Sequence, residues 1–133
     1  MVEAALILPI FFMVVLGIVE FGRAFMICQS LQNAAREGCR QAVTGSYTTA
    51  QVISNIKSEM QTAGVKDTIS LNISVIVTVY TGNPAVANNE VANATTRDLV
   101  NVNVGISFAQ VALVPGNYLG NMMLYGKSAM RHE

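Results

Sequence analysis

Sixteen consecutive uncharged residues, Ala4 to Val19, form an apolar run close to the first residue of the chain. A single acid, Glu3, precedes the run, and the next charged residues after it are Glu20 and Arg23. The run is long enough to enter a bilayer and too apolar to stay in contact with water. Any fold of this chain must therefore cover the run with lipid or with other protein chains.

Helical periodicity continues beyond the apolar run, because apolar side chains recur at helical spacing over residues 21–35. No strong helix breaker intervenes until Gly45. The pattern predicts a single helix over residues 2–44, roughly 65 Å long at 1.5 Å per residue. About half of this helix can sit in lipid, and we expect its second half, residues 25–42, to lie on the sheet of a folded domain.

The residues around the run argue against a removable signal peptide and against an ordinary signal anchor. No basic residue precedes Arg23, and no small-residue cleavage site follows Val19. A carboxylate at the depth of Glu3 is unfavourable in lipid unless it is paired. Removal of a basic leader would explain both features, since Glu3 could then pair with a free amine of its own chain or of a neighbour. Met1 as an initiator residue is the open alternative.

The residues after Gly45 predict a second helix and two strands. Thr48 and Gln51 have the spacing of a capping box, and the amphipathic stripe that follows ends near Gly64. Apolar and polar residues then alternate over residues 69–80 and again over residues 100–108, which is typical of half-buried strands.

A third strand is predicted at about residues 122–131, after a turn at residues 115–117. The small polar segment over residues 81–96 predicts an exposed loop. The predicted fold class is α+β, with a long apolar N-terminal helix, a short second helix and a small antiparallel sheet of about three strands. The predicted organisation is a long helix over residues 1–44, with its membrane or filament-core half over 1–22, and a globular head over 45–133.

Composition argues against several classes of function. Only 12% of the 133 residues are charged and the formal net charge is zero, so no basic field is present to hold nucleic acid. The single histidine, His132, has no cluster of metal ligands around it in the sequence. Phosphate-binding loops and a nucleophile elbow are absent from the sequence as well. We therefore expect no enzyme, no metal and no cofactor.

The predicted loop offers two further candidate sites. Asn93 in the loop and Asn72 in the first predicted strand each begin an N-glycosylation sequon, and the loop position is the better candidate. Asn83, Asn88 and the single carboxylate Glu90 lack the spacing of a calcium-binding loop. Calcium binding is therefore not expected.

The two cysteines, Cys28 and Cys39, both lie on the predicted long helix. Their spacing corresponds to about 16 Å of helical rise, whereas a disulfide needs Cα atoms within about 7 Å. They cannot bridge each other while the helix is intact. We expect buried thiols, with an intermolecular bridge as the alternative.

Four short motifs follow one another along the predicted helix. They are Val2-Glu3, Leu6-Ile7-Leu8-Pro9, Glu20-Phe21-Gly22-Arg23 and the stretch Asn33-Ala34-Ala35-Arg36-Glu37-Gly38-Cys39-Arg40-Gln41-Ala42. In this order they resemble the N-terminus of TadE/TadG-like proteins of tight-adherence (Tad) pilus systems, which are themselves similar to type IV pilins. Residues 128–133 resemble the ending of the same family. The usual position of the acid in such proteins is the fifth mature residue, whereas here it is the third.

The resemblance implies a type IV pilin-like fold and a structural role, as a major or minor pilin of an extracellular fimbrium that serves adhesion. It also implies partners: copies of the same chain in a helical filament, other pilins, a prepilin peptidase and the pilus assembly machinery. The chain would reside in the cytoplasmic membrane, through a transmembrane helix, before it enters a filament at the cell surface.

Five residues of the helix are candidates for assembly. Glu3 can fix the register between neighbouring helices by pairing with an amine. Pro9 is expected to end or kink the first turns, and Gly17 permits close helix–helix approach. Glu20 and Arg23 have the spacing of an i,i+3 ion pair, formed within the helix or between subunits.

Two alternatives stay open. The chain can instead be a bitopic membrane-anchored protein whose extracytoplasmic domain binds a partner. The cluster of Arg36, Glu37 and Arg40 can be a solvated helix face or a contact with the head of a neighbouring subunit.

Overall fold

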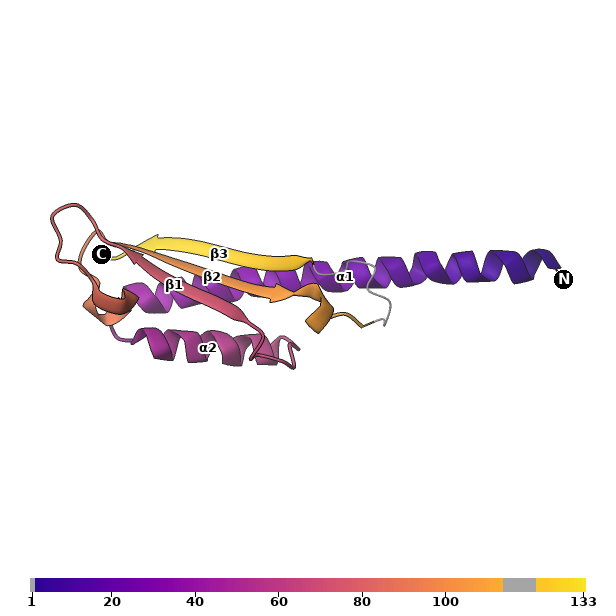
Figure 1. Ribbon diagram of the computed structural model, residues 1–133, viewed down its shortest axis with the longest axis horizontal. Helices are drawn as coiled ribbons and strands as arrows, with labels where there is room; N and C mark the ends of the chain where they lie inside the picture. Colours follow the sequence, from indigo (N-terminus) through magenta and orange to yellow (C-terminus); the bar gives the residue numbers. More distant parts are fainter. Residues whose placement is uncertain (1, 114–121) are drawn as a thin grey trace.

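The computed structural model describes residues 2–113 and 122–133, and it has one long helix, one short helix and a three-stranded antiparallel sheet (Figure 1). This confirms the predicted α+β fold class. In chain order the elements are α1 (Val2–Val43), α2 (Thr49–Thr62), β1 (Asn72–Thr78), the 3₁₀ turns η1 (Ala87–Asn89) and η2 (Val91–Asn93), β2 (Leu99–Ser107), the 3₁₀ turn η3 (Phe108–Gln110) and β3 (Met123–Arg131).

Helix α1 has two parts with different surroundings. Its first half, which carries the apolar run Ala4–Val19, projects from the head and is called the stalk below (Figure 1). Its second half runs alongside the sheet. As predicted, the second half supplies part of the core, since Ile27, Leu31, Ala35 and Cys39 are all buried. The chain is therefore a folded head built around the end of a stalk.

Helix α1 continues through Pro9, so this proline does not end the first turns, and the alternative that it kinks them stays a prediction. Proline lacks the N–H that would bond the carbonyl four residues earlier. The carbonyl group that lacks this hydrogen bond is that of Ala5, which lies in the first turns because Pro9 is close to the N-terminus of α1. The remaining length of the helix keeps its hydrogen-bond ladder.

The ends of the helices follow the predicted signals. Gly45, two residues after the end of α1, has a φ of +66°, and Gly64, two residues after the end of α2, has a φ of +92°. Glycine reaches this left-handed region without the strain that a side chain adds, which suits it to follow a helix. At the start of α2 the capping box is present, with reciprocal hydrogen bonds between Thr48 and Gln51.

The three strands are ordered β1-β2-β3, and both pairs are antiparallel. Val102 in the central strand lies opposite Val75 of β1 and Ser128 of β3. Alternate residues of β2 are fully or almost fully buried on the face that α1 and α2 cover, while Asn101 and Asn103 lie on the other face. The buried core residues of β2 are Val100, Val102, Val104 and Ile106.

Two glycines allow the second half of α1 to approach its neighbours closely. A Cβ added at Gly126 of β3 would lie 2.2 Å from the backbone carbonyl of Leu31. A Cβ added at Gly38 of α1 would lie 2.6 Å from Cδ1 of Ile56 in α2. The contact at Gly126 is with backbone, which cannot rotate away, so β3 and α1 can be this close only with glycine at that position.

Strand β1 begins at Asn72, three residues later than predicted. The carboxylate of Asp67 accepts hydrogen bonds from the N–H groups of Ile69 and Ser70, which closes a local turn. The turn takes Ile69 out of the strand and leaves it 90% exposed. Strands β2 and β3 agree with the predicted ranges to within a residue or two, and the predicted turn at 115–117 lies outside the described residues.

The segment predicted as an exposed loop is only partly exposed, because Val91 is fully buried. The adjacent residue Glu90 accepts hydrogen bonds from the backbone N–H and the hydroxyl of Thr49 at the start of α2. The loop is thus fixed to the N-terminus of α2, and the short polar sequence gave no sign of this contact.

Asp98 organises the other end of the same segment. Its buried carboxylate accepts hydrogen bonds from the backbone and hydroxyl of Thr95, from the N–H of Tyr80 and from the side-chain amide of Asn83. These donors, led by the Thr95 and Tyr80 N–H groups, hold the pKa of Asp98 well below its usual range. A charged carboxylate with four donors is stable in the interior, so the connection between β1 and β2 closes around it.

Candidate assembly surface on the N-terminal helix

The stalk presents an apolar surface on all sides. Along the part of the chain that the structure describes, α1 is the one helix that is long and apolar enough to cross a membrane. Only 6% of its most apolar stretch is buried within the chain. Large side chains from Leu6 to Val19 are exposed, among them Phe12 at 54% and Ile18 at 67%. A helix that is apolar all round needs lipid or other helices around it.

Gly17 leaves a gap in this apolar surface. Apart from its two chain neighbours and the backbone of its own helical turns, no described residue has an atom within 4 Å of a Cβ built at this position, and the same holds at Gly22. Neither glycine is therefore required for packing inside the chain. Helices that carry such gaps can approach one another more closely than helices covered by large side chains.

The apolar run ends at a carboxylate that the chain itself covers. Glu20 is only 3% exposed, and its Oε1 accepts a hydrogen bond from the N–H of Leu113 at 3.1 Å. One turn further along α1, the Nε of Arg23 donates to the carbonyl oxygen of Val111. Both side chains therefore hold residues 111–113, which follow η3, against the helix.

This contact was missed from the sequence, where Glu20 and Arg23 were considered only as an i,i+3 pair. The backbone partner of Glu20 lies 93 positions away along the chain, and that of Arg23 lies 88 positions away. Backbone groups carry no side-chain signal, so residues 111–113 show nothing in the sequence that marks them as partners. The pairing of Glu20 with Arg23, within or between subunits, stays a prediction.

Three of the other candidate residues, Pro9, Asn72 and Asn93, lie on the surface. The side chain of Glu3 lies outside the described residues, so its role in register stays a prediction. Pro9 is exposed on the stalk. Asn93 ends η2 and Asn72 begins β1, and both side chains are exposed, which glycosylation requires but does not by itself demonstrate.

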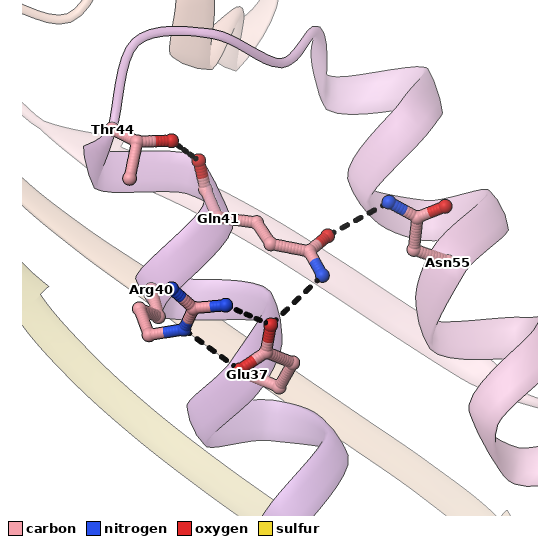
Figure 2. A network of polar contacts seen from close by, with 5 residues as sticks. All are labelled: Glu37, Arg40, Gln41, Thr44 and Asn55. Carbon is pink, nitrogen blue, oxygen red and sulfur yellow. Dashed lines mark hydrogen bonds and ion pairs between the residues drawn. The ribbon is translucent and has the colours of Figure 1, made fainter.

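Charged side chains near the end of α1 form a hydrogen-bond network with residues of the same chain, shown in Figure 2. Arg40 donates two hydrogen bonds to the carboxylate of Glu37, at 2.8 and 2.6 Å. The side-chain nitrogen of Gln41 also donates to the carboxylate of Glu37. The side-chain oxygen of Gln41 accepts a hydrogen bond from the side-chain amide of Asn55 in α2 at 2.8 Å. The network links the two helices along an exposed edge, which favours the interpretation of Glu37 and Arg40 as a solvated helix face.

Both cysteines are free, which agrees with the prediction that they do not bridge each other. Cys39 is fully buried, and its Sγ donates to the carbonyl oxygen of Ser128 in β3 at 3.2 Å. Burial raises the pKa of this thiol. Cys28 is partly buried against the core.

Polar side chains of the loop over residues 81–96 form hydrogen bonds with the rest of the head. The side-chain oxygen of Asn89 accepts from the N–H of Val77, Asn83 donates to Asp98, and Glu90 bonds to Thr49. Within residues 2–113 and 122–133, no group of three or more His, Cys, Asp or Glu side chains gathers in a way that could hold a metal ion.

Comparison with known families gives one match, and it falls on the long helix. The model of the family described as TadE-like protein matches residues 1–40. The matched segment contains the stalk, Glu20, Arg23 and most of the part of α1 that packs on the sheet. Comparisons with curated proteins and with solved structures give no significant match.

Proposed function

Because residues 1–40 match the model of the TadE-like protein family, we propose that this chain is a structural subunit of an extracellular Tad pilus, a type IV-like filament. The observation that carries the proposal is the stalk: an apolar helical surface that is almost wholly exposed and projects from a folded head (Figure 1). The buried apolar core of the head begins at Ile27, beyond the apolar run Ala4–Val19. The stalk is therefore free for contacts outside the chain.

The stalk has two environments in this proposal. It lies first in the cytoplasmic membrane and then in the core of a filament, where the stalks of other subunits replace lipid. Sixteen mostly apolar residues, each contributing about 1–2 kcal/mol on burial, give a large gross driving force for leaving water. The gap at Gly17 favours close packing between neighbouring stalks.

The partners follow from this role. They are copies of the chain in a helical filament, other pilins, a prepilin peptidase and the assembly machinery at the membrane. The proposal covers a main filament subunit and a minor one. The role is structural rather than enzymatic, as the family match implies.

The test is a comparison of sheared surface material from cells with and without the gene. Filaments visible by negative-stain microscopy that contain this chain by mass spectrometry would support the proposal. Recovery of the chain only in the membrane fraction, with no filament that contains it, would contradict the proposal. That result would favour a bitopic membrane protein with a partner-binding head.

A further inference from the structure

The apolar surface continues past the stalk onto the base of the head. Four large apolar side chains stand out there: Phe25 and Met26 on α1, Ile69 in the turn before β1 and Leu113 after η3. They are 68%, 71%, 90% and 64% exposed. We call these four residues the basal collar. The connection from α2 to β1 and the segment after η3 both lie at the end of the head from which the stalk emerges (Figure 1).

Two shallow grooves connect parts of this collar. One, of about 370 Å³, is lined by Phe25, Met26 and Ala63, among others. The other, of about 380 Å³, lies between α1, the connection after α2 and residues 110–113, and it is lined by Arg23, Lys66 and Leu113, among others. Arg23 lines both grooves, so apolar side chains and two basic residues share one end of the head.

The length of the apolar run places this end of the head at a membrane surface. Sixteen residues span about 24 Å at 1.5 Å per residue, whereas the hydrocarbon core of a bilayer is about 30 Å thick. About four further residues of α1 are needed to complete the span, which brings the helix to Arg23. The basal collar starts within one turn of that point.

Glu20, the first residue after the apolar run, can lie at the depth of the membrane surface because residues 111–113 of the same chain cover its carboxylate. Glu20 is 3% exposed, and the N–H of Leu113 bonds to its carboxylate. Residues 111–113 therefore keep the acid away from lipid and at the same time hold Leu113 outward. A carboxylate facing lipid without such cover would be strongly unfavourable.

The turn at Asp67 fixes Ile69 in its exposed position. The carboxylate of Asp67 accepts hydrogen bonds from Ile69 and Ser70, and the neighbouring Lys66 lines the groove together with Arg23. Apolar side chains that enter the interfacial layer, together with basic groups near lipid phosphates, are typical of membrane-surface contacts.

We propose that the basal collar is a membrane-contact surface, so that the head rests on the bilayer and does not stand off from it. Ile69, Leu113 and Phe25 enter the interfacial layer, and Lys66 lies near the lipid phosphates. This inference rests on the proposed function, because it requires the stalk to span the membrane before assembly.

Single tryptophans test the inference directly, because the chain contains no tryptophan of its own. The variants are Ile69→Trp and Leu113→Trp in the collar, Phe12→Trp in the stalk and Tyr80→Trp after β1, at the opposite end of the head (Figure 1). Each full-length variant is reconstituted in vesicles of phosphatidylcholine and phosphatidylglycerol that carry bromine either near the headgroup or deep in the acyl chain. The measurement is the quenching and the wavelength of tryptophan emission.

We expect deep bromine to quench Phe12→Trp, and bromine near the headgroup to quench Ile69→Trp and Leu113→Trp with a blue shift. Tyr80→Trp should keep its full emission. If Phe12→Trp is quenched while both collar probes behave like Tyr80→Trp, the head stands off the bilayer and the inference is overturned, although the anchored stalk remains. If Phe12→Trp is not quenched, the stalk does not span and the proposed function fails together with the inference.

A second copy of the chain could cover the collar instead of lipid. In that case the collar probes would shift to the blue without quenching, and the shift would grow with the ratio of protein to lipid. Such a result would overturn the inference. The charge contribution is tested with Lys66→Glu, which should weaken quenching of Ile69→Trp, against Lys57→Glu on α2 as the matched control, which should not.

Discussion

A single buried carboxylate, Asp98, holds the longest described connection of the head. Four hydrogen bonds converge on it from Tyr80, Asn83 and Thr95, and together they lower its pKa. The ionised form is therefore favoured in the folded state relative to the unfolded state, where the pKa is near 3.9. The stabilisation is present above that value and is lost as pH falls toward the lower pKa of the folded state.

Asp98→Asn is expected to lower the melting temperature of the full chain in detergent micelles by several degrees at neutral pH. An amide cannot accept all four hydrogen bonds, and it carries no charge for these donors to stabilise. Thermal unfolding followed by circular dichroism between pH 7 and pH 3 is the measurement. The difference between wild type and variant should shrink as pH falls.

Asp67→Asn is the matched control, since Asp67 is a partly exposed carboxylate in a local turn. It should change the melting temperature less than Asp98→Asn does. Equal effects of the two substitutions, or a difference that does not depend on pH, would show that the carboxylate of Asp98 is not the source of the stability.

A second prediction at the residue scale concerns the close contact at Gly126. In Gly126→Ala the new Cβ would meet the Leu31 carbonyl at 2.2 Å, so α1 and β3 must separate. Overpacking of this kind typically reduces stability by about 1–3 kcal/mol, and contact with backbone puts this site at the upper end. Urea unfolding in detergent measures the loss. Gly22→Ala is the control, because no described atom lies within 4 Å of its Cβ, and it should not destabilise the head.

At the scale of the elements, the junction between stalk and head depends on two side chains of α1. Glu20 and Arg23 bond to the backbone of residues 111–113, so these residues follow the helix. In Glu20→Ala the N–H of Leu113 loses its acceptor. We expect faster hydrogen exchange over residues 110–113, with unchanged exchange in β2.

Arg36→Ala is a suitable control for this experiment because Arg36 is exposed on the same helix. It should leave exchange over residues 110–113 unchanged. Equal protection of that segment in Glu20→Ala and in wild type would show that the contact with Glu20 does not hold the segment.

Local signals predicted most of the elements, and the apolar pattern predicted that the second half of α1 packs on the sheet, but none of the hydrogen bonds between distant segments was predicted. Gly45 and the capping box at Thr48 fixed the helix ends, because both act within a few residues. Strand β1 starts later than its alternation suggested, since the Asp67 turn competes with the strand pattern at Ile69. The roles of Glu20 and Asp98 needed the fold, because their partners are largely backbone N–H groups, which every sequence segment carries alike.

At the scale of the whole molecule, the proposed function predicts that changes on the stalk affect filament assembly without affecting the folding of the head. Gly17→Leu is expected to leave the circular dichroism spectrum and the melting temperature of the head unchanged, because no described atom contacts that position. The added side chain should strongly reduce sheared filaments by holding neighbouring stalks apart. Gly17→Ala, which adds a single methyl group, should reduce them less. Normal filament yield from Gly17→Leu would exclude close packing at this glycine.

Glu3→Ala tests the register hypothesis. We expect a reduced amount of filament with an unchanged amount of membrane-bound chain, since the apolar run that inserts in lipid is intact. Immunoblots of sheared and membrane fractions provide both quantities. Glu133→Ala, at the opposite end of the chain, is a charge-matched control. Wild-type filaments from Glu3→Ala would remove this residue from the assembly mechanism.

Helix α1 is one uninterrupted rod from the stalk to the end of the head, and β3 lies alongside it. A pulling force along the stalk is therefore directed along the helix–sheet interface, where it acts as shear. Contacts loaded in shear share the force and must slip together, unlike contacts that are peeled apart one by one. The close approach of Leu31 to Gly126 lies within this interface and resists sliding. In the proposed filament, a chain built in this way would transmit tension through its core while its surface loops remain unloaded.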